Sequence, residues 1–100
     1  MNIQIPDSIK IGGYVYEIVS DKETDEVLDA GGLVGQACHD DCIIKIKKEM
    51  NDQLRVNTFL HETLHCIDQV FNGNKLDEDT INVIANGLHQ VIKQLQEDDF

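Results

Sequence analysis

The chain has 100 residues, of which 41% are hydrophobic and 27% charged, a composition typical of a folded globular protein rather than a disordered segment. This length, with no internal linker, predicts a single domain over residues 1–100. The 8 basic and 19 acidic residues give a formal net charge of −11, which disfavours nucleic acid and anionic membranes as partners. We find no membrane-length apolar run and no secretory signal, so we expect a cytoplasmic location with three reduced cysteines.

Apolar and polar residues alternate on both sides of Gly12-Gly13, a pattern that predicts a β-hairpin with glycine in its tight turn. We expect the tyrosines of this hairpin, Tyr14 and Tyr16, to pack within it. The polar run that follows, residues 20–29, is expected to form a solvated connection or a poorly formed helical turn. The apolar residues of the hairpin are Ile9, Ile11, Tyr14, Tyr16 and Ile18.

A second pair of apolar stretches, residues 33–38 and 42–46, is joined by the polar turn 39–41 and predicts two further strands. Lysines follow or alternate with the isoleucines of the second stretch. Because lysines commonly protect an exposed sheet edge, we expect residues 42–48 to form an edge strand.

Two helices are predicted in the second half, over about residues 52–72 and 77–96. Gly73 ends the first, and Asp77 is the N-cap of the second. The first carries a stripe of Leu60, Leu64, Ile67 and Phe71, flanked by Phe59, Thr63, Cys66 and Val70; the second carries Ile81, Ile84, Ala85, Leu88, Val91, Ile92 and Leu95. The whole pattern predicts an α+β fold in which a small twisted sheet, built from the hairpin and the strand pair, packs on two helices.

The first helix contains the segment His61-Glu62-Thr63-Leu64-His65. At about 100° per residue, the two histidines lie about 40° apart and one turn along the helix, so both imidazoles can reach one ion. Glu62 points away from these two positions but stays close enough to act on a water at the ion. Two histidine ligands beside a carboxylate base are the arrangement that zinc-assisted hydrolysis needs, so we expect zinc here.

A catalytic zinc usually takes a third protein ligand, and the acids at the start of the second helix are the nearest candidates in the sequence. Asp79 points away from the apolar stripe and should be solvated, while Asp77 is best used as the N-cap. Glu78 sits at the edge of the stripe and can face the first helix, so it is our expected third ligand. An acid favoured there only by the helix dipole is the alternative.

Asp68 is the other candidate ligand, because it follows His65 by three residues on the same face. It could also orient an imidazole, or it could be an ordinary surface acid. Cys38, His39 and Cys42 form a weak second metal pattern, and we expect the cysteines to pack as small apolar side chains. His89 is expected to be solvated.

In the order of these parts the chain resembles the minimal zincin-like metallopeptidases of phages and prophages, distant relatives of the ImmA-like and SprT-like peptidases. The resemblance rests on residues 11–16, the strand pair 35–46, Thr58 to His65, and Leu76-Asp77-Glu78 with Ile81, Ala85, Gly87 and Leu88. It implies a zinc ion held by His61, His65 and Glu78, with Glu62 as the catalytic general base. It also implies a peptide or protein substrate that docks on a sheet edge, which we place at residues 42–48, in a bacterial or phage-infected cell.

The sequence therefore predicts a zinc-dependent metallopeptidase that hydrolyses peptide bonds. Two alternatives stay open: a non-catalytic zinc-binding regulatory or interaction protein on the same frame, and a domain without metal. The small size of the chain, which leaves little room for substrate pockets, favours the first of them. The sequence identifies neither the substrate, nor the groups that stabilise the oxyanion, nor the oligomeric state.

Overall fold

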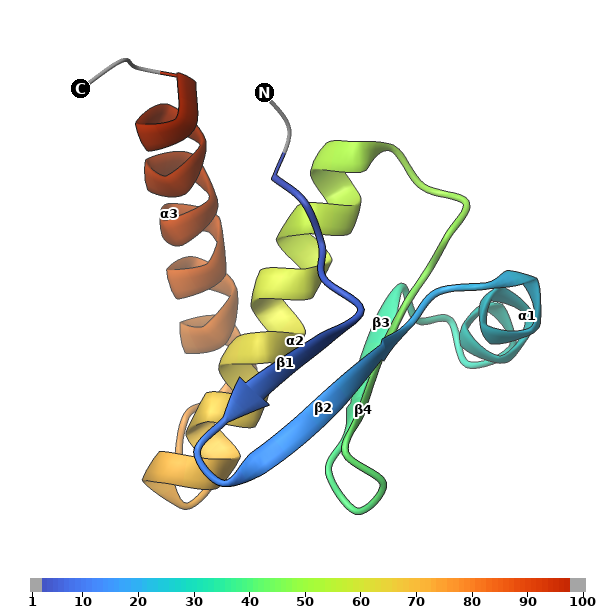
Figure 1. Cartoon of the computed structure of the whole chain (residues 1–100), viewed down its shortest axis with the longest axis horizontal. Helices are drawn as coiled ribbons and strands as arrows, with labels where there is room; N and C mark the ends of the chain where they lie inside the picture. Colours follow the sequence, from blue (N-terminus) through green and yellow to red (C-terminus); the bar gives the residue numbers. More distant parts are fainter. Residues whose placement is uncertain (1–2, 98–100) are drawn as a thin grey trace.

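A four-stranded sheet and three helices make up the computed structural model, which describes residues 3–97 (Figure 1). The α+β prediction is confirmed, with one more helix than expected. In chain order the elements are β1 (Ser8–Ile11), β2 (Tyr14–Val19), α1 (Lys22–Ala30), β3 (Gly35–Cys38), β4 (Ile43–Ile46), α2 (Asp52–Asn72) and α3 (Glu78–Glu97). The helix α2 lies across one face of the sheet, α3 packs on α2, and α1 sits beyond the end of β2 (Figure 1).

The predicted hairpin is present as β1 and β2, which pair in antiparallel register with Ile11 opposite Tyr14. Gly12 turns the chain with a φ of 62°, in the region that favours glycine. The alternation directs Ile11 and Tyr16 into the core under α2. Tyr16 is 2% exposed as expected, but Tyr14 is 55% exposed, so the prediction that it packs is wrong. Tyr14 lies beside the turn, at the exposed start of β2.

The strand order is β1-β2-β4-β3, which puts β4 inside the sheet. It pairs in parallel with β2 on one side and antiparallel with β3 on the other. The prediction that residues 42–48 form an edge strand is therefore wrong, and the edge beside α2 is β3. The prediction relied on the lysines of this segment. Lys47, however, forms an ion pair of 2.7 Å with Asp29 instead of protecting an edge.

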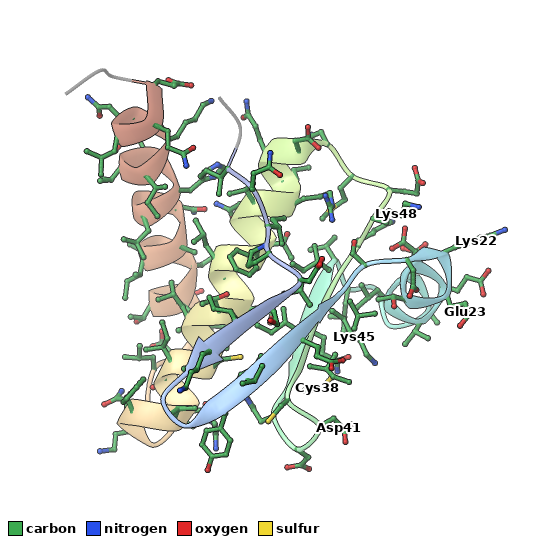
Figure 2. All side chains as sticks on the ribbon, in the orientation of Figure 1. Lys22, Glu23, Cys38, Asp41, Lys45 and Lys48 are labelled. Carbon is green, nitrogen blue, oxygen red and sulfur yellow. The ribbon has the colours of Figure 1, made fainter. Side chains whose placement is uncertain are left out.

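Residues 22–30 form a regular helix, where the sequence predicted a solvated connection or a poor turn. Asp21 caps this helix by accepting from the Thr24 N–H at 2.7 Å. Asp25 is buried and accepts from the backbone N–H groups of Lys48 (2.7 Å) and Glu49 (3.0 Å). Both partners lie more than twenty residues away, which is why the local pattern did not reveal that this acid is a structural anchor. Other charged residues of α1, such as Lys22 and Glu23, project into solvent (Figure 2).

The helix α2 begins and ends as predicted, with Asn51 as N-cap and Gly73 in the left-handed conformation after it. The face that it buries differs from the predicted stripe. Phe59 and Cys66 enter the core with Ile44 and Ile46, whereas Ile67 is 40% and Phe71 69% exposed. The sheet covers the flank of α2 that carries Phe59 and Cys66, and the described residues leave Ile67 and Phe71 uncovered.

Asp77 caps α3 as predicted, accepting from the Thr80 N–H at 2.7 Å. Only Ile81 and Ala85 of the predicted apolar stripe are buried, because α3 packs on α2 in an outer layer rather than on the sheet. Ile84, Leu88, Val91 and Leu95, which belong to the same stripe, are 37–56% exposed. Within residues 3–97, no helix is long and apolar enough to cross a membrane.

The anchoring of α1 by Asp25 predicts a pH-dependent contribution to stability. The hydrogen bond from Lys48, with that from Glu49, lowers the pKa of Asp25 against the opposing effect of burial. The stabilisation should be complete above the ordinary aspartate pKa of about 3.9 and be lost as pH falls through the lower folded-state value. We expect Asp25→Ala to lower the midpoint of thermal unfolding at pH 7 by about 4–8 °C.

The control is Glu26→Ala, which removes an exposed acid from the same helix and should leave the midpoint nearly unchanged. The difference between parent and Asp25→Ala should narrow below about pH 4. A difference of the same size at every pH would contradict a role for the ionised carboxylate.

Candidate metal centre

The helical spacing of His61 and His65 brings their imidazoles together on α2. Their Nε2 atoms lie 3.2 Å apart, and both rings are partly buried. The ring centroids are 4.9 Å apart with an interplanar angle of 66°, so the rings are not stacked. Two nitrogen lone pairs can therefore be directed at one point beside the helix.

Glu78, the first residue of α3, completes this group. One carboxylate oxygen lies 2.5 Å from His61 Nε2 and the other 3.0 Å from His65 Nε2. The candidate ligand atoms of the three residues all lie within 4.8 Å of one another. No other cluster of three or more His, Cys, Asp or Glu side chains within residues 3–97 has the spacing to hold a metal ion.

The position of Glu78 depends on the loop between α2 and α3, and Asp68 holds that loop. Asp68 is 1% exposed and accepts from the backbone N–H groups of Lys75 (3.1 Å) and Leu76 (3.0 Å) and from Asn72 Nδ2 (2.9 Å). Its backbone carbonyl accepts from Asn74 at 3.0 Å. Burial acts to raise the pKa of Asp68, but these hydrogen bonds outweigh it and lower the pKa.

From the sequence, Asp68 could be a metal ligand, a hydrogen-bond partner of an imidazole, or a surface acid. The surface assignment is wrong, because the side chain is buried. Its oxygens face the loop N–H groups, and it does not join the group formed by His61, His65 and Glu78. Asp77, the other alternative ligand, is used as the cap of α3, and Asp79 is exposed as expected.

Glu62 of α2 is 9% exposed, and its side chain lies against the edge strand β3. A β-carbon on Gly35 would clash with Thr58 Cγ2 and stand 3.2 Å from Glu62 Oε2, so only glycine lets the strand approach this closely. Burial raises the pKa of Glu62, while the neighbouring His61 and His65 act in the opposite direction. Gly35 is thus a site residue that the sequence pattern did not single out for this role.

The edge strand β3 presents unpaired backbone groups beside the site. Lys47 N–H donates to Val34 C=O, and Gly35 pairs with Ile46, so the alternation of an antiparallel ladder turns the N–H and C=O groups of Gly35 and Ala37 away from β4. The Ala37 N–H also acts to lower the pKa of Glu62. The free edge of the sheet therefore runs along the group of metal-ligating side chains.

Two adjoining cavities, each of about 370 Å³, open along this edge and share Gly35, His61, Glu62 and Glu78 in their walls. One extends past Val34, Leu54 and Asn82, and the other reaches His65 and His39. His39 lies 3.3 Å from the buried Tyr16 hydroxyl through its Nδ1. From the sequence we considered His39 only as part of the pattern with Cys38 and Cys42. Its place beside the site depends on the strand order, which brings the turn between β3 and β4 there.

The remaining cysteines and histidine lie outside this group. Cys38 and Cys42 are half-buried free thiols, and Cys42 packs against the core rather than joining a metal cluster. Cys66 is also a free thiol, and burial raises its pKa to about 12. His89 was expected to be solvated, but it is half-buried, with Nδ1 3.4 Å from Asn57 Nδ2.

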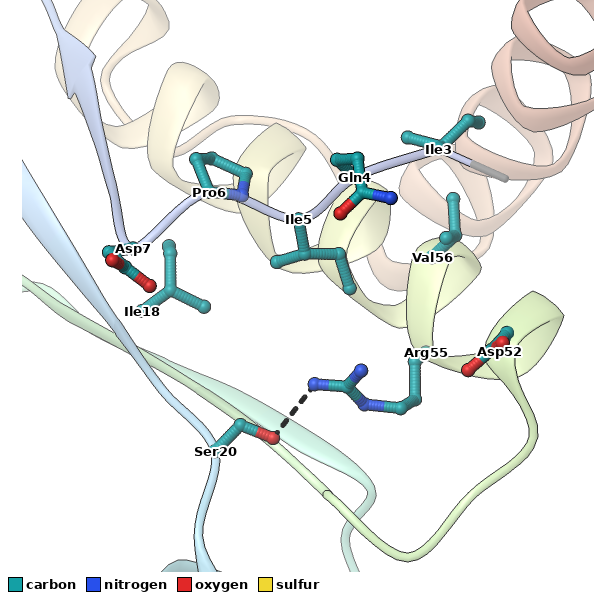
Figure 3. Close-up of a pocket in the computed structure, with 10 residues that line it drawn as sticks. All are labelled: Ile3, Gln4, Ile5, Pro6, Asp7, Ile18, Ser20, Asp52, Arg55 and Val56. Carbon is teal, nitrogen blue, oxygen red and sulfur yellow. Dashed lines mark hydrogen bonds between the residues drawn. The ribbon is translucent and has the colours of Figure 1, made fainter. Parts of the chain in front are cut away.

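A separate cavity of about 380 Å³ lies between residues 3–7, the end of β2 and the first turn of α2 (Figure 3). Arg55 enters it and donates from Nη2 to Ser20 Oγ at 3.0 Å. Its Nε is buried without a hydrogen-bond partner among the described residues. Asp7 and Asp52 line the same cavity, so its walls carry both signs of charge and none of the metal-ligating group.

Comparison of the chain with protein-family models, with curated proteins and with solved structures finds no match. The candidate site therefore rests on its own geometry.

The loop contacts of Asp68 generate a prediction about the position of Glu78. In Asp68→Asn, one of the two oxygens becomes an N–H donor, so Lys75 or Leu76 loses its acceptor. We expect amide hydrogen exchange of these two residues to accelerate about tenfold or more, with a lower thermal midpoint.

Asp79→Asn, the same change of charge at an exposed site near the loop, is the matched control. It should leave the exchange of Lys75 and Leu76 unaltered. Equal protection of these amides in parent and Asp68→Asn would show that the carboxylate does not hold the loop.

Proposed function

We propose that the chain is a zinc-dependent metallopeptidase of the zincin-like type. The observation that carries the proposal is the convergence of His61, His65 and Glu78 within 4.8 Å, beside a buried Glu62 in an open cleft. The same arrangement is what the histidine spacing and the order of the two helices led us to expect. The absence of any matching family leaves geometry and chemistry as its support.

The three donors fit zinc better than the other common metals. Two imidazole nitrogens and one carboxylate oxygen are a usual catalytic zinc set, which leaves a fourth position open. Magnesium and calcium prefer sites built from oxygen atoms alone. When bound, zinc supplies a Lewis acid that makes water acidic enough to attack a carbonyl near neutral pH.

Glu62 is the residue that would move the proton. It lines the same cleft as the three ligands, and the close approach of Gly35 keeps it shielded from bulk water. Its carboxylate would accept a proton from the attacking water and return it to the leaving amine. The two histidines and Glu78 would hold the zinc ion, whereas Glu62 would act as the general base and then as the general acid.

The edge of β3 is the surface on which we place an extended peptide substrate. The outward N–H and C=O groups of Gly35 and the outward C=O of Ala37 can pair with a peptide backbone by β-addition, alongside the cleft that contains His61 and Glu62. A peptide bond held along this edge would lie next to the metal-ligating group. This assignment replaces the inner strand β4 suggested by the sequence.

The proposal predicts that the protein binds one zinc ion per chain. His61→Ala and Glu78→Ala should each weaken zinc binding by about 100-fold or more, because each removes a direct ligand. Elemental analysis after dialysis and competition with a chromogenic chelator would measure zinc content and affinity.

His89→Ala is the matched control, since it removes a half-buried histidine from outside the group. It should retain zinc with the parent affinity. Equal zinc affinity in Glu78→Ala and the parent would contradict the assignment of Glu78 as a ligand.

A second prediction separates metal binding from catalysis. Glu62→Gln keeps the shape of the side chain but removes its basic oxygen, so it should retain zinc and lose at least about 100-fold in the rate of peptide hydrolysis. A quenched-fluorescence peptide library, assayed with the zinc-loaded parent and variant, measures this loss. A variant that cleaves as fast as the parent would rule out Glu62 as the base.

A non-catalytic zinc-binding interaction protein is the second candidate, and the large exposed apolar surface of α3 favours it specifically. That function predicts zinc in the parent and in Glu62→Gln, with no hydrolysis by either. The same pair of measurements therefore distinguishes the two functions.

A further inference from the structure

The helix α3 carries an apolar stripe that the other elements within residues 3–97 leave exposed. Ile84, Leu88, Val91 and Leu95 are 37%, 38%, 48% and 56% exposed, while Ile81 and Ala85 on the adjacent face are fully buried against α2. The spacing of the exposed four, 4-3-4, is that of a coiled-coil seam. Such a repeat on one side of a helix is suited to packing against a second helix.

Charge is distributed around this stripe in an unusual way. None of the 19 acidic residues of the chain falls between positions 80 and 96, where Lys93 is the only charged residue. The polar residues there are chiefly neutral amides, such as Asn86, Gln90 and Gln94. Depletion of charge around an apolar centre is a feature of protein–protein interfaces.

The stripe lies on the flank of the helix pair away from the candidate metal centre. At about 100° per residue, its four side chains are turned about 80–140° around α3 from Glu78. On α2, the exposed Ile67 and Phe71 are turned about 80–120° from His61 around the helix axis. This rotation places them on the same flank of the helix pair as the stripe of α3. An occupant of this face would leave the cleft open.

The face is large enough to support a stable contact. A helix of 20 residues is about 30 Å long, and neighbouring helices lie about 8–10 Å apart, so the outer face of α2 and α3 covers roughly 600 Å². Two such faces would together bury about 1,200 Å², the lower limit of the range for specific, stable protein–protein interfaces.

We propose that this face, formed by Ile67 and Phe71 of α2 and Ile84, Leu88, Val91 and Leu95 of α3, binds the same face of a second copy of the chain. With a net charge of −11, two copies repel each other over most approaches, but a contact through the acid-free stretch 80–96 keeps their carboxylates apart. A two-fold axis places the 4-3-4 stripes of the two α3 helices together. The inference is independent of the proposed function.

Sedimentation velocity of the full chain over a range of concentrations tests this proposal, with Val91→Glu and Leu88→Glu as interface variants. A charge buried in the contact should raise the dimer dissociation constant by at least about 30-fold, the scale of an interface hot spot. Val83→Glu is the matched control, because Val83 is on the same helix and 71% exposed but lies off the stripe. Circular dichroism and the thermal unfolding midpoint of each variant verify that the fold is retained.

A dimeric parent, a dimeric Val83→Glu variant and folded, monomeric Val91→Glu and Leu88→Glu variants would support the proposal. A parent that stays monomeric at every concentration overturns it, and leaves the face to another partner. Dimers that persist in both interface variants overturn it too, and would direct attention to the free edge of β3. Dissociation by Val83→Glu as strongly as by Val91→Glu would equally count against the stripe.

Discussion

The buried carboxylate of Asp68 is the interaction on which the candidate site depends. Its two oxygens accept from the N–H groups of Lys75 and Leu76, and its carbonyl accepts from Asn74, so one residue near the end of α2 determines the path of the loop. That path sets where α3 begins. Because Glu78 is the first residue of α3, its two contacts with the histidines follow from the loop. The hydrogen bonds explain why a carboxylate with 1% exposure keeps its charge.

A second constraint acts from the opposite wall of the cleft. Gly35 has no side chain, and this lets the edge strand β3 lie against Thr58 and Glu62 of α2. The close approach buries Glu62 and at the same time brings unpaired backbone groups of β3 to the rim of the site. Side chains of α2, the first residue of α3 and the edge strand β3 are thus brought together around one cleft.

The outer layer of the fold has a different character from the site. The helix α3 packs on α2 in an outer layer, with only Ile81 and Ala85 of its described residues buried, so much of its apolar stripe stays exposed. A large apolar surface on a small protein usually marks a place where another molecule binds. The lack of acidic residues along the same stretch, in a chain otherwise rich in them, is consistent with this interpretation. Binding there would also add to the buried area that a chain of this size lacks by itself.

The sequence by itself determined the features that depend on local periodicity and capping. The bounds of α2, the turn at Gly12, the cap at Asp77 and the shared face of His61 and His65 follow from spacings within a few residues. The tertiary structure decided which strand is an edge, that residues 22–30 form an anchored helix, and which faces of α2 and α3 are covered. It also decided that Asp68 faces the loop and that His39 lines the cleft. These features depend on partners that are distant in the chain, such as Lys48 for Asp25. A hydrophobic pattern shows that a side chain is apolar, but it does not show which neighbour will cover that side chain.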